Sequence, residues 1–302
     1  MTAPALVAVE SSREHLREAC DVVGLHDQAE QAELIRLGEN AMWRLPSLGL
    51  VARIARDGQQ RAAAREVRVA SWLAANDIPA VQPAVELEQA LEVSGRAVTW
   101  WYDLGPHRPG TVAELAGLLR RLHALPVPGN LALGRADPFV RLDERIGQTD
   151  LDPAQRAWLH QRLEQLREAW AELPYASPEV VVHGDAWAGN VAVTPDGTAI
   201  LLDFERTATG PREWDLASTA VAHQTSGTVS AEDYRRYCRA YGFDVTDWPG
   251  YPTLRGAREL RLVCFAAQTA VQHPSAHSQA VYRLECLQGK RGPRPWSWQP
   301  VP

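Results

Sequence analysis

The sequence predicts an α+β chain of two lobes, a small antiparallel sheet with a helix and then a larger, mostly helical lobe. Three observations carry this prediction. Strand-like segments, with helical segments among them, fill the first hundred residues. Long amphipathic helical patterns follow them. The composition changes near residue 103, so the predicted lobes are residues 1–102, which would bind nucleotide, and 103–302, which would hold the catalytic and substrate-binding parts.

The first lobe should open with a short helix and a pair of strands. Ser11 and Glu14 have capping-box spacing, and apolar residues follow at helical spacing until Gly24. Residues 32–46 and 48–56 are typical of strands, and Gly38-Glu39-Asn40 divides the first segment into the two arms of a hairpin.

The first lobe should continue with a helix and a second hairpin. Residues 60–77 place apolar side chains among polar ones in a pattern that suits a helix. Pro79 prevents this helix from continuing. Residues 90–104 indicate a hairpin around Ser94-Gly95 that ends in an aromatic-rich strand. The lobe is therefore expected to be a small sheet with helices packed on it.

The second lobe should be helical, with one hairpin near its middle. Residues 111–125 and 153–173 are amphipathic helical segments. Two short apolar runs within residues 191–205 surround Pro195-Asp196-Gly197, which favours a turn. From Asp215 onward the pattern is mostly helical until a Pro- and Trp-rich tail.

Composition narrows the classes of function. The chain has 302 residues, 45% of them hydrophobic, a net charge of −6 and a pI of about 5.9. This balance argues against a nucleic-acid or anionic-membrane partner and is compatible with a cationic substrate. The four cysteines form no metal-binding spacing, no signal peptide is evident and no run reaches the length of a membrane helix. A cytoplasmic protein with reduced, buried thiols is expected.

Polar residues interrupt the apolar segment VVVHGDAWAGNVAV at residues 180–193. Asp185 and Asn190 lie in this loop, and Asp203 closes the following hairpin. Mg²⁺ prefers oxygen ligands, so Asn190 and Asp203 are candidates to hold a Mg²⁺–nucleotide, while Asp185 is a candidate to orient an attacking hydroxyl and accept its proton. Each residue alone is as well explained as a polar turn at a strand end, whereas the three together favour phosphoryl transfer. His183 is expected to pack within the loop.

The segment HGDAWAGN followed by LLDFE resembles the aminoglycoside phosphotransferase family, which is related to choline kinases and has a protein-kinase-like fold. The later segment GPREWDLAS also matches this family. The resemblance implies that Asp185 is the catalytic base and that Asn190 and Asp203 bind magnesium. It also implies that the carboxylate of Asp215 accepts backbone hydrogen bonds from the catalytic loop.

The first lobe resembles the same family more loosely. GENAMWRL resembles the short hairpin that covers the nucleotide, which implies phosphate contacts at Gly38 and Asn40, although an ordinary hairpin turn explains them equally well. The helix of residues 60–77 supplies Glu66 as the family's helix glutamate. The segment TWWYDL resembles the hinge between lobes, whose backbone from Trp101 to Asp103 would contact adenine.

One feature departs from the family pattern. Kinases place a lysine on the strand that faces the helix glutamate, whereas this chain offers Arg53 in LVARIAR. An arginine is permanently charged and grips phosphate with two donors, so Arg53 paired with Glu66 is the expected phosphate clamp. A plain surface ion pair is the alternative for these two residues.

The sequence therefore predicts an ATP- or GTP-dependent, Mg²⁺-dependent kinase for a hydroxyl group of a small molecule. The mild acidity favours a cationic acceptor such as an aminoglycoside, and with it a role in antibiotic resistance. Two alternatives stay open. The acceptor is a Ser or Thr of a peptide in a biosynthetic pathway, or the chain is a non-catalytic nucleotide-binding module, which the missing lysine motivates. No nucleic-acid or membrane partner is expected.

Overall fold

The computed structural model describes residues 3–38, 40–174 and 178–301, and the chain forms two compact units. The first unit consists of Met1–Gly110, Pro128–Ala132 and Gly189–Thr207. The second unit consists of Thr111–Val127, Leu133–Ala188 and Ala208–Pro302. The lobe boundary at residues 102 and 103 stays a prediction.

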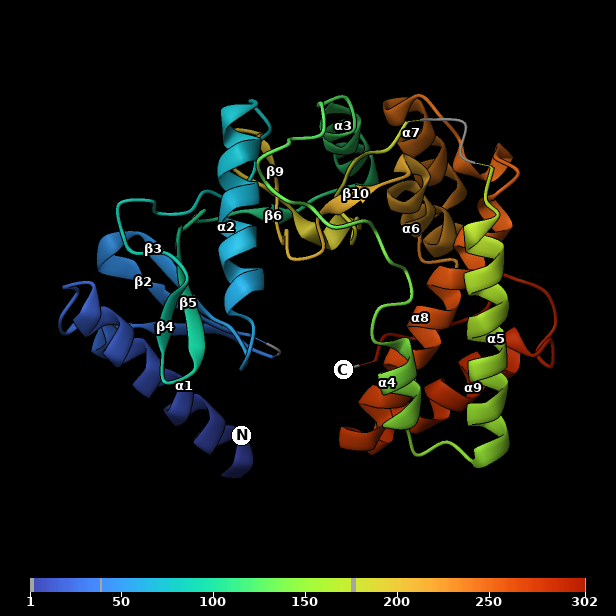
Figure 1. Cartoon of the computed structure of the whole chain (residues 1–302), viewed down its shortest axis with the longest axis horizontal. Coiled ribbons are helices and arrows are strands. Elements are labelled where there is room, and N and C mark those ends of the chain that lie inside the picture. Colours follow the sequence, from blue (N-terminus) through green and yellow to red (C-terminus); the bar gives the residue numbers. More distant parts are fainter. Residues whose placement is uncertain (1–2, 39, 175–177, 302) are drawn as a thin grey trace. The chain divides into compact units, whose positions relative to one another are not determined.

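A five-stranded antiparallel sheet forms the centre of the first unit (Figure 1). Its strand order is β1-β2-β3-β5-β4. The strands are β1 (Glu33–Leu37), β2 (Ala41–Leu45), β3 (Leu50–Ile54), β4 (Leu91–Val93) and β5 (Arg96–Tyr102). Ser94 and Gly95 both have positive φ, 48° and 81°, as a two-residue hairpin turn between β4 and β5 requires. Both predicted hairpins of this sheet are confirmed.

One face of the sheet builds the hydrophobic core of the first unit. Trp43, Ala52 and Trp100 pair directly across β2, β3 and β5 and are fully buried. The helix α1 (Ala3–Val22) covers this face, and its residues Leu16 and Cys20 join the same core. Burial of large apolar side chains is the main force that holds α1 on the sheet.

The helix α1 is longer than the sequence suggested. It begins at Ala3, so Ser11 lies inside the helix and does not cap it. The neighbouring Ser12 donates its hydroxyl to the carbonyl of Val9 at 2.9 Å, a bond that a serine inside a helix often makes. The prediction of a helix start at Ser11 was therefore wrong, and the end before Gly24, which has φ +75°, was right.

The other face of the sheet carries Arg53. Met42, Arg53 and Thr99 pair directly across β2, β3 and β5 on this face. The helix α2 (Gln60–Ala75) confirms the predicted helix, and its Glu66 pairs with Arg53. The sheet therefore presents one charged residue of β3 to one charged residue of α2.

A small three-stranded sheet completes the first unit. Its strands are β6 (Arg108–Pro109), β8 (Val191–Val193) and β9 (Ala199–Leu201), in the order β6-β8-β9. The backbone of Leu201 donates to Pro79 at 2.9 Å and accepts from Val81 at 3.0 Å. This pairing fixes the segment that contains Asp203 beside the loop that follows α2.

The second unit is mostly helical (Figure 1). Its helices are α3 (Val112–Leu122), α4 (Leu142–Gly147), α5 (Pro153–Ala171), α6 (Arg212–Gln224), α7 (Ala231–Tyr241), α8 (Tyr251–Gln272) and α9 (His277–Leu287). Thr111 caps α3 and Asp152 caps α5, each in a capping box. Helix α3 packs on α7, and α5, α6 and α9 pack on α8. The predicted α+β class is thereby confirmed, although the sequence did not predict α4.

Short elements complete the description. The strands β7 (Val180–Val182) and β10 (Ala208–Gly210) pair antiparallel in the second unit. Single turns of 3₁₀ helix are η1 (Gln28–Gln31), η2 (Pro46–Leu48), η3 (Ala188–Asn190), η4 (Val245–Asp247) and η5 (Pro274–Ala276). The strand β7 ends directly before His183, where the predicted catalytic loop begins. Its pairing with β10 therefore fixes the start of that loop.

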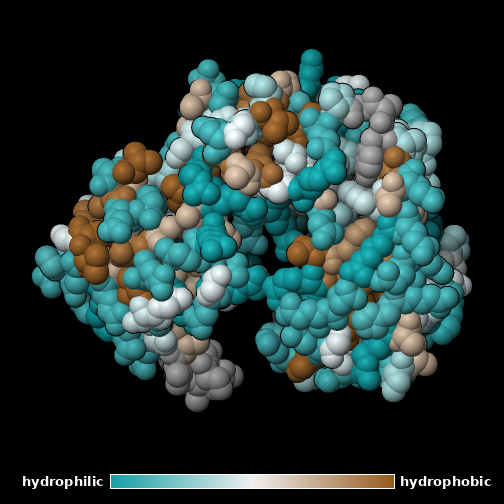
Figure 2. Space-filling view, in the orientation of Figure 1, coloured by the Kyte–Doolittle hydropathy of each residue, from teal (hydrophilic) through white to brown (hydrophobic). Residues whose placement is uncertain are grey.

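The surface visible in Figure 2 is mostly hydrophilic, with hydrophobic residues exposed on the first unit at the left of the view. Among residues 3–38, 40–174 and 178–301, no helix has the length and apolar character needed to cross a membrane. The four cysteines are all free thiols, three of them buried, as the sequence predicted.

Candidate functional site

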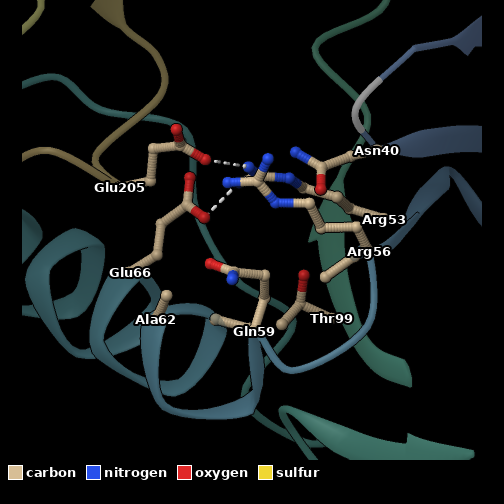
Figure 3. A pocket seen from close by; sticks show the side chains of 10 residues that line it. Asn40, Arg53, Arg56, Gln59, Ala62, Glu66, Thr99 and Glu205 are labelled. Atoms are coloured by element: carbon tan, nitrogen blue, oxygen red, sulfur yellow. Dashed lines mark hydrogen bonds and ion pairs between the residues drawn. The ribbon is translucent and has the colours of Figure 1, made fainter. Parts of the chain in front are cut away.

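Three side chains of the first unit meet around the guanidinium group of Arg53, and we call these three residues and Arg53 the Arg53 cluster (Figure 3). Glu66 of α2 forms an ion pair with Nη1 of Arg53, and Oε2 of Glu205 accepts from Nη2 at 3.0 Å. Asn40 presents its amide oxygen to Nη2 and Nε, at 2.7 and 3.2 Å, in the orientation that gives both side chains partners. Arg53 therefore binds a turn, a helix and the segment after β9 at once.

Burial and neighbouring charges set the protonation of this cluster. The side chains of Arg53 and Glu66 are only 15% and 5% exposed. Burial lowers the pKa of Arg53, but the carboxylates of Glu66, Asp203 and Glu205 outweigh it and leave the pKa above its ordinary value. Burial and the nearby carboxylates of Asp203 and Glu205 raise the pKa of Glu66 above its ordinary value, although Arg53 opposes that rise. Arg53 therefore stays a cation and favours the charged form of Glu66 from beside it.

A second set of contacts fixes Glu66. Its Oε1 accepts the backbone N–H of Phe204 at 3.3 Å, so one carboxylate links α2 to β3 and to the segment after β9. The alternative of a plain surface ion pair does not fit a pair with so little exposure. Removing one partner of a buried pair leaves the other charge uncompensated, which typically costs about 3–5 kcal/mol.

The Arg53 cluster lines a small cavity of the first unit. The lining residues are Asn40, Arg53, Ala55, Arg56, Gln59, Ala62, Ala63, Glu66, Thr99 and Glu205. The cavity offers about 20 Å³ to the centre of a water molecule, room for roughly one water. A phosphate group therefore requires these side chains to rearrange if it is to enter this cavity.

The turn before β2 contributes Asn40 to the cluster, as described. The backbone N–H of Gly38 donates to the carbonyl of Asn40 at 3.2 Å, so this donor is used within the turn. Glu39 lies outside the described residues. The phosphate contacts proposed for Gly38 and Asn40 stay predictions.

The predicted hinge lies at the end of β5. Trp101 is buried and its Nε1 donates to the hydroxyl of Thr99 at 2.9 Å. Asp103 accepts from Nε of Arg44 at 2.7 Å, and its own backbone N–H donates to Gly49 at 2.8 Å. An adenine contact through the Asp103 donor would require that bond to open, and the contact stays a prediction.

Asp203 carries the clearest sign of a missing partner. One of its carboxylate oxygens, Oδ1, is buried and has no hydrogen-bond partner within the described residues. Its φ of +63° is unusual for a residue other than glycine. Such orphaned acceptors are rare in folded proteins and are commonly satisfied by an ion or water. A hard cation that takes oxygen ligands fits this position.

Asn190 lies beside the same segment. Its side chain is buried, and its backbone carbonyl accepts the N–H of Leu202 at 3.0 Å. Among the residues that the structure describes, no three His, Cys, Asp or Glu side chains gather closely enough to hold a metal alone. A Mg²⁺ ion at Asp203 and Asn190 would therefore need phosphate oxygens or water as further ligands.

The predicted catalytic loop belongs to the second unit, where Asp215 organises it. The carboxylate of Asp215 is fully buried and accepts the backbone N–H of His183 at 2.6 Å and of Gly184 at 2.9 Å. Nε2 of His123 lies 3.1 Å from the same carboxylate. Burial alone raises the pKa of Asp215, but these partners outweigh it and hold the pKa below its ordinary value.

Asp185 follows directly in this loop. Its backbone N–H donates to Nδ1 of His183 at 3.3 Å, so the histidine packs and hydrogen-bonds within the loop. Asp185 belongs to the second unit and Asn190 to the first, and four residues of sequence separate them. The catalytic role of Asp185 stays a prediction.

The structure thus brings Arg53, Glu66 and Asn40 together and adds two residues that the sequence did not assign. Glu205 is a partner of Arg53, and His123 is a partner of Asp215. Glu205 follows Asp203 by two residues, which is a usable signal in the sequence. His123 lies 92 residues from Asp215, and nothing in the sequence links the two.

Residues 33–257 match the model of the family described as "Phosphotransferase enzyme family", called APH. The match spans most of the chain, so the chain belongs to this family, as the sequence motifs predicted. No curated protein sequence matches the chain closely enough to count as a relative.

Solved structures share the fold over nearly the whole chain. A choline/ethanolamine kinase family protein from Mesorhizobium loti is similar at 17% identity and a TM-score of 0.65, covering 94% of each chain. An aminoglycoside phosphotransferase from Streptomyces rimosus is similar at 20% identity and a TM-score of 0.58, covering 82% of this chain and 98% of its own. Amicoumacin kinase, solved in complex with AMP-PNP, Ca²⁺ and Ami, is similar at 14% identity and a TM-score of 0.67, covering 87% of this chain and 89% of its own. At these identities the likeness confirms the kinase-like fold.

Proposed function

We propose that this chain transfers the γ-phosphate of ATP to a hydroxyl group of a small molecule, with Mg²⁺ bound at Asp203 and Asn190. One observation supports this most strongly. The buried Arg53–Glu66 ion pair lies in the same cluster as the segment after β9, where Asp203 keeps a buried carboxylate oxygen that has no partner among the residues the structure describes. An ordinary structural ion pair does not explain that orphaned oxygen.

The proposed roles follow from the chemistry of each side chain. Asp203 and the side-chain carbonyl of Asn190 would hold the cation through oxygen atoms, and the cation, when bound, neutralises phosphate charge. Arg53, fixed by Glu66, would add a permanent positive charge beside the phosphates. Asp185 would orient the acceptor hydroxyl and accept its proton. Phosphoryl transfer depends mainly on such positioning and electrostatic stabilisation.

The acceptor is proposed to be a cationic, amino-bearing compound. The net charge of −6 favours approach of a cation. The structural neighbours include enzymes named for choline, an aminoglycoside and amicoumacin. A role in antibiotic resistance follows if the acceptor is an antibiotic, and the free thiols suit a reducing cytoplasm.

The direct experiment is an acceptor screen. Purified protein with ATP and Mg²⁺ is incubated with hydroxyl-bearing antibiotics, amino alcohols and Ser- or Thr-containing peptides, and mass spectrometry detects the addition of one phosphate. Phosphate on a small molecule supports the proposal, and phosphate only on peptides replaces its acceptor class. Repeating the screen with GTP in place of ATP determines which nucleotide donates the phosphate.

A non-catalytic nucleotide-binding module is the second candidate, and one observation favours it. Arg53 stands where kinases have a lysine, and its donors are largely engaged within the protein. This candidate predicts that ATP binds while no acceptor, and no water, receives phosphate. Any stoichiometric phosphate transfer that Asp185→Ala removes would exclude it.

A further inference from the structure

The hydrogen-bonding capacity of Arg53 is nearly exhausted within the protein. A guanidinium group has five N–H donors. Glu66 takes one on Nη1, Glu205 takes one on Nη2, and Asn40 takes a second on Nη2 and the one on Nε. At most one donor on Nη1 is therefore left for a phosphate. A bidentate grip on phosphate requires one of the three partners to leave.

We propose that Glu205 is the partner that leaves, so that it acts as an exchangeable counter-ion that competes with nucleotide phosphate for Arg53. This inference rests on the proposed function, because it assumes that a nucleotide binds at the Arg53 cluster. It makes Glu205 a positioning residue, which acts on the nucleotide through Arg53.

Exposure distinguishes Glu205 from Glu66. The side chain of Glu205 is 31% exposed, whereas that of Glu66 is 5% exposed. Glu66 also accepts the N–H of Phe204, so its release would strand a buried carboxylate and a backbone donor. Glu205 can turn toward solvent without leaving a buried charge unpaired.

The backbone of Glu205 is held independently of its carboxylate. Arg65 of α2 donates to the backbone carbonyl of Glu205. The carboxylate can therefore swing away from Arg53 while the segment that carries Asp203 keeps its place. Asn40 is neutral, so releasing it would relieve no repulsion against phosphate.

Charge makes Glu205 and the nucleotide phosphate compete for Arg53. Glu66 and Glu205 contact Arg53 directly, and the charge of Asp203 also acts on it. A triphosphate that approaches Arg53 meets the negative charge of Glu205 at close range. Without a divalent cation to offset it, this repulsion and competition should weaken nucleotide binding.

The test measures nucleotide affinity rather than turnover. Isothermal titration gives the dissociation constant of ATP for wild type and Glu205→Gln, each with Mg²⁺ and with a chelator. Glu30→Gln is the matched control, because Glu30 is also a glutamate of the first unit paired with an arginine, Arg17 at 2.7 Å, but lies on η1 next to α1. Thermal melting of each variant checks the fold.

The proposal predicts that Glu205→Gln tightens metal-free ATP binding about three- to tenfold, with a smaller gain in Mg²⁺. The control Glu30→Gln should change the metal-free dissociation constant of ATP less than twofold. In an Arg53→Lys background, the effect of Glu205→Gln should shrink below twofold, because lysine cannot hold all three partners.

Unchanged or weaker metal-free affinity in Glu205→Gln overturns the inference and leaves the proposed function intact. The same holds if affinity is lost only in Mg²⁺, since Glu205 would then act as a metal ligand. Failure of the wild type to bind ATP under any condition overturns both. If Glu205→Gln does not fold, Glu205→Ala gives the same reading, because it also removes the carboxylate that competes with phosphate for Arg53.

Discussion

Replacing Asp215 with asparagine should destabilise the second unit, because its carboxylate is the acceptor for three groups. It accepts from His183 at 2.6 Å, Gly184 at 2.9 Å and His123 at 3.1 Å, and it is fully buried. Asparagine keeps one acceptor oxygen and places an NH₂ group against a donor. Hydrogen bonds to a charged group contribute about 1.5–3 kcal/mol each, and relief of the buried charge offsets part of the loss.

The expected loss is therefore about 3 kcal/mol of unfolding free energy for Asp215→Asn. Urea denaturation followed by circular dichroism measures it, with Asp150→Asn as a control, since Asp150 is exposed. The control should lose less than about 0.5 kcal/mol. A loss below about 1 kcal/mol in Asp215→Asn would refute the argument that this carboxylate organises the loop.

The difference in unfolding free energy between wild type and Asp215→Asn should depend on pH in one direction. The pKa of Asp215 is lower in the folded protein than its ordinary value of 3.8. Its contribution is therefore fully present above about pH 4–5 and is lost as the pH falls through the folded pKa. The gap between wild type and Asp215→Asn should narrow in acid, and a gap that widens below pH 4 would contradict the assignment.

Three further predictions concern the first unit and the thiols. Arg53→Lys should lower kcat/KM for ATP about tenfold or more, because a lysine is a point charge with a different reach; steady-state kinetics that match wild type would count against the cluster. Glu66→Gln should cost about 3 kcal/mol in urea unfolding, since it leaves Arg53 with less compensation, and a neutral result would argue for a merely exposed pair. Burial raises the pKa of Cys264 to about 12, so this thiol should react with a disulfide reagent at about pH 8 at least 100-fold more slowly in native than in denatured protein. Fast labelling of Cys264 in the native protein would show that its thiol is accessible and would contradict the prediction.

Many of the strands and helices, and the family, were predictable because each has a local signal. Alternation and turn residues predicted β4 and β5 around Ser94-Gly95, and helical spacing predicted α2 with Glu66. The start of α1 was missed because Ser11 and Glu14 have capping-box spacing inside a longer helix. A local motif cannot show that the preceding residues already continue the helix.

The candidate site was predictable where its residues share one motif and not where tertiary contacts pair them. Asp203 was found from its motif, but the orphaned oxygen became visible only with its surroundings. Glu205 was assigned no partner because Arg53 lies 152 residues away along the chain. The same reason hid the contact of His123 with Asp215. Long-range pairing depends on packing, which a single sequence does not encode locally.

We propose that Asp185 serves phosphate transfer from a nucleotide. The most direct measurement compares wild type and Asp185→Ala for two quantities, the rate of phosphate transfer to the best acceptor and the dissociation constant of ATP with Mg²⁺. We predict that Asp185→Ala lowers the rate of phosphate transfer at least about 100-fold and changes the dissociation constant of ATP less than about threefold. Transfer at the wild-type rate in Asp185→Ala would contradict it.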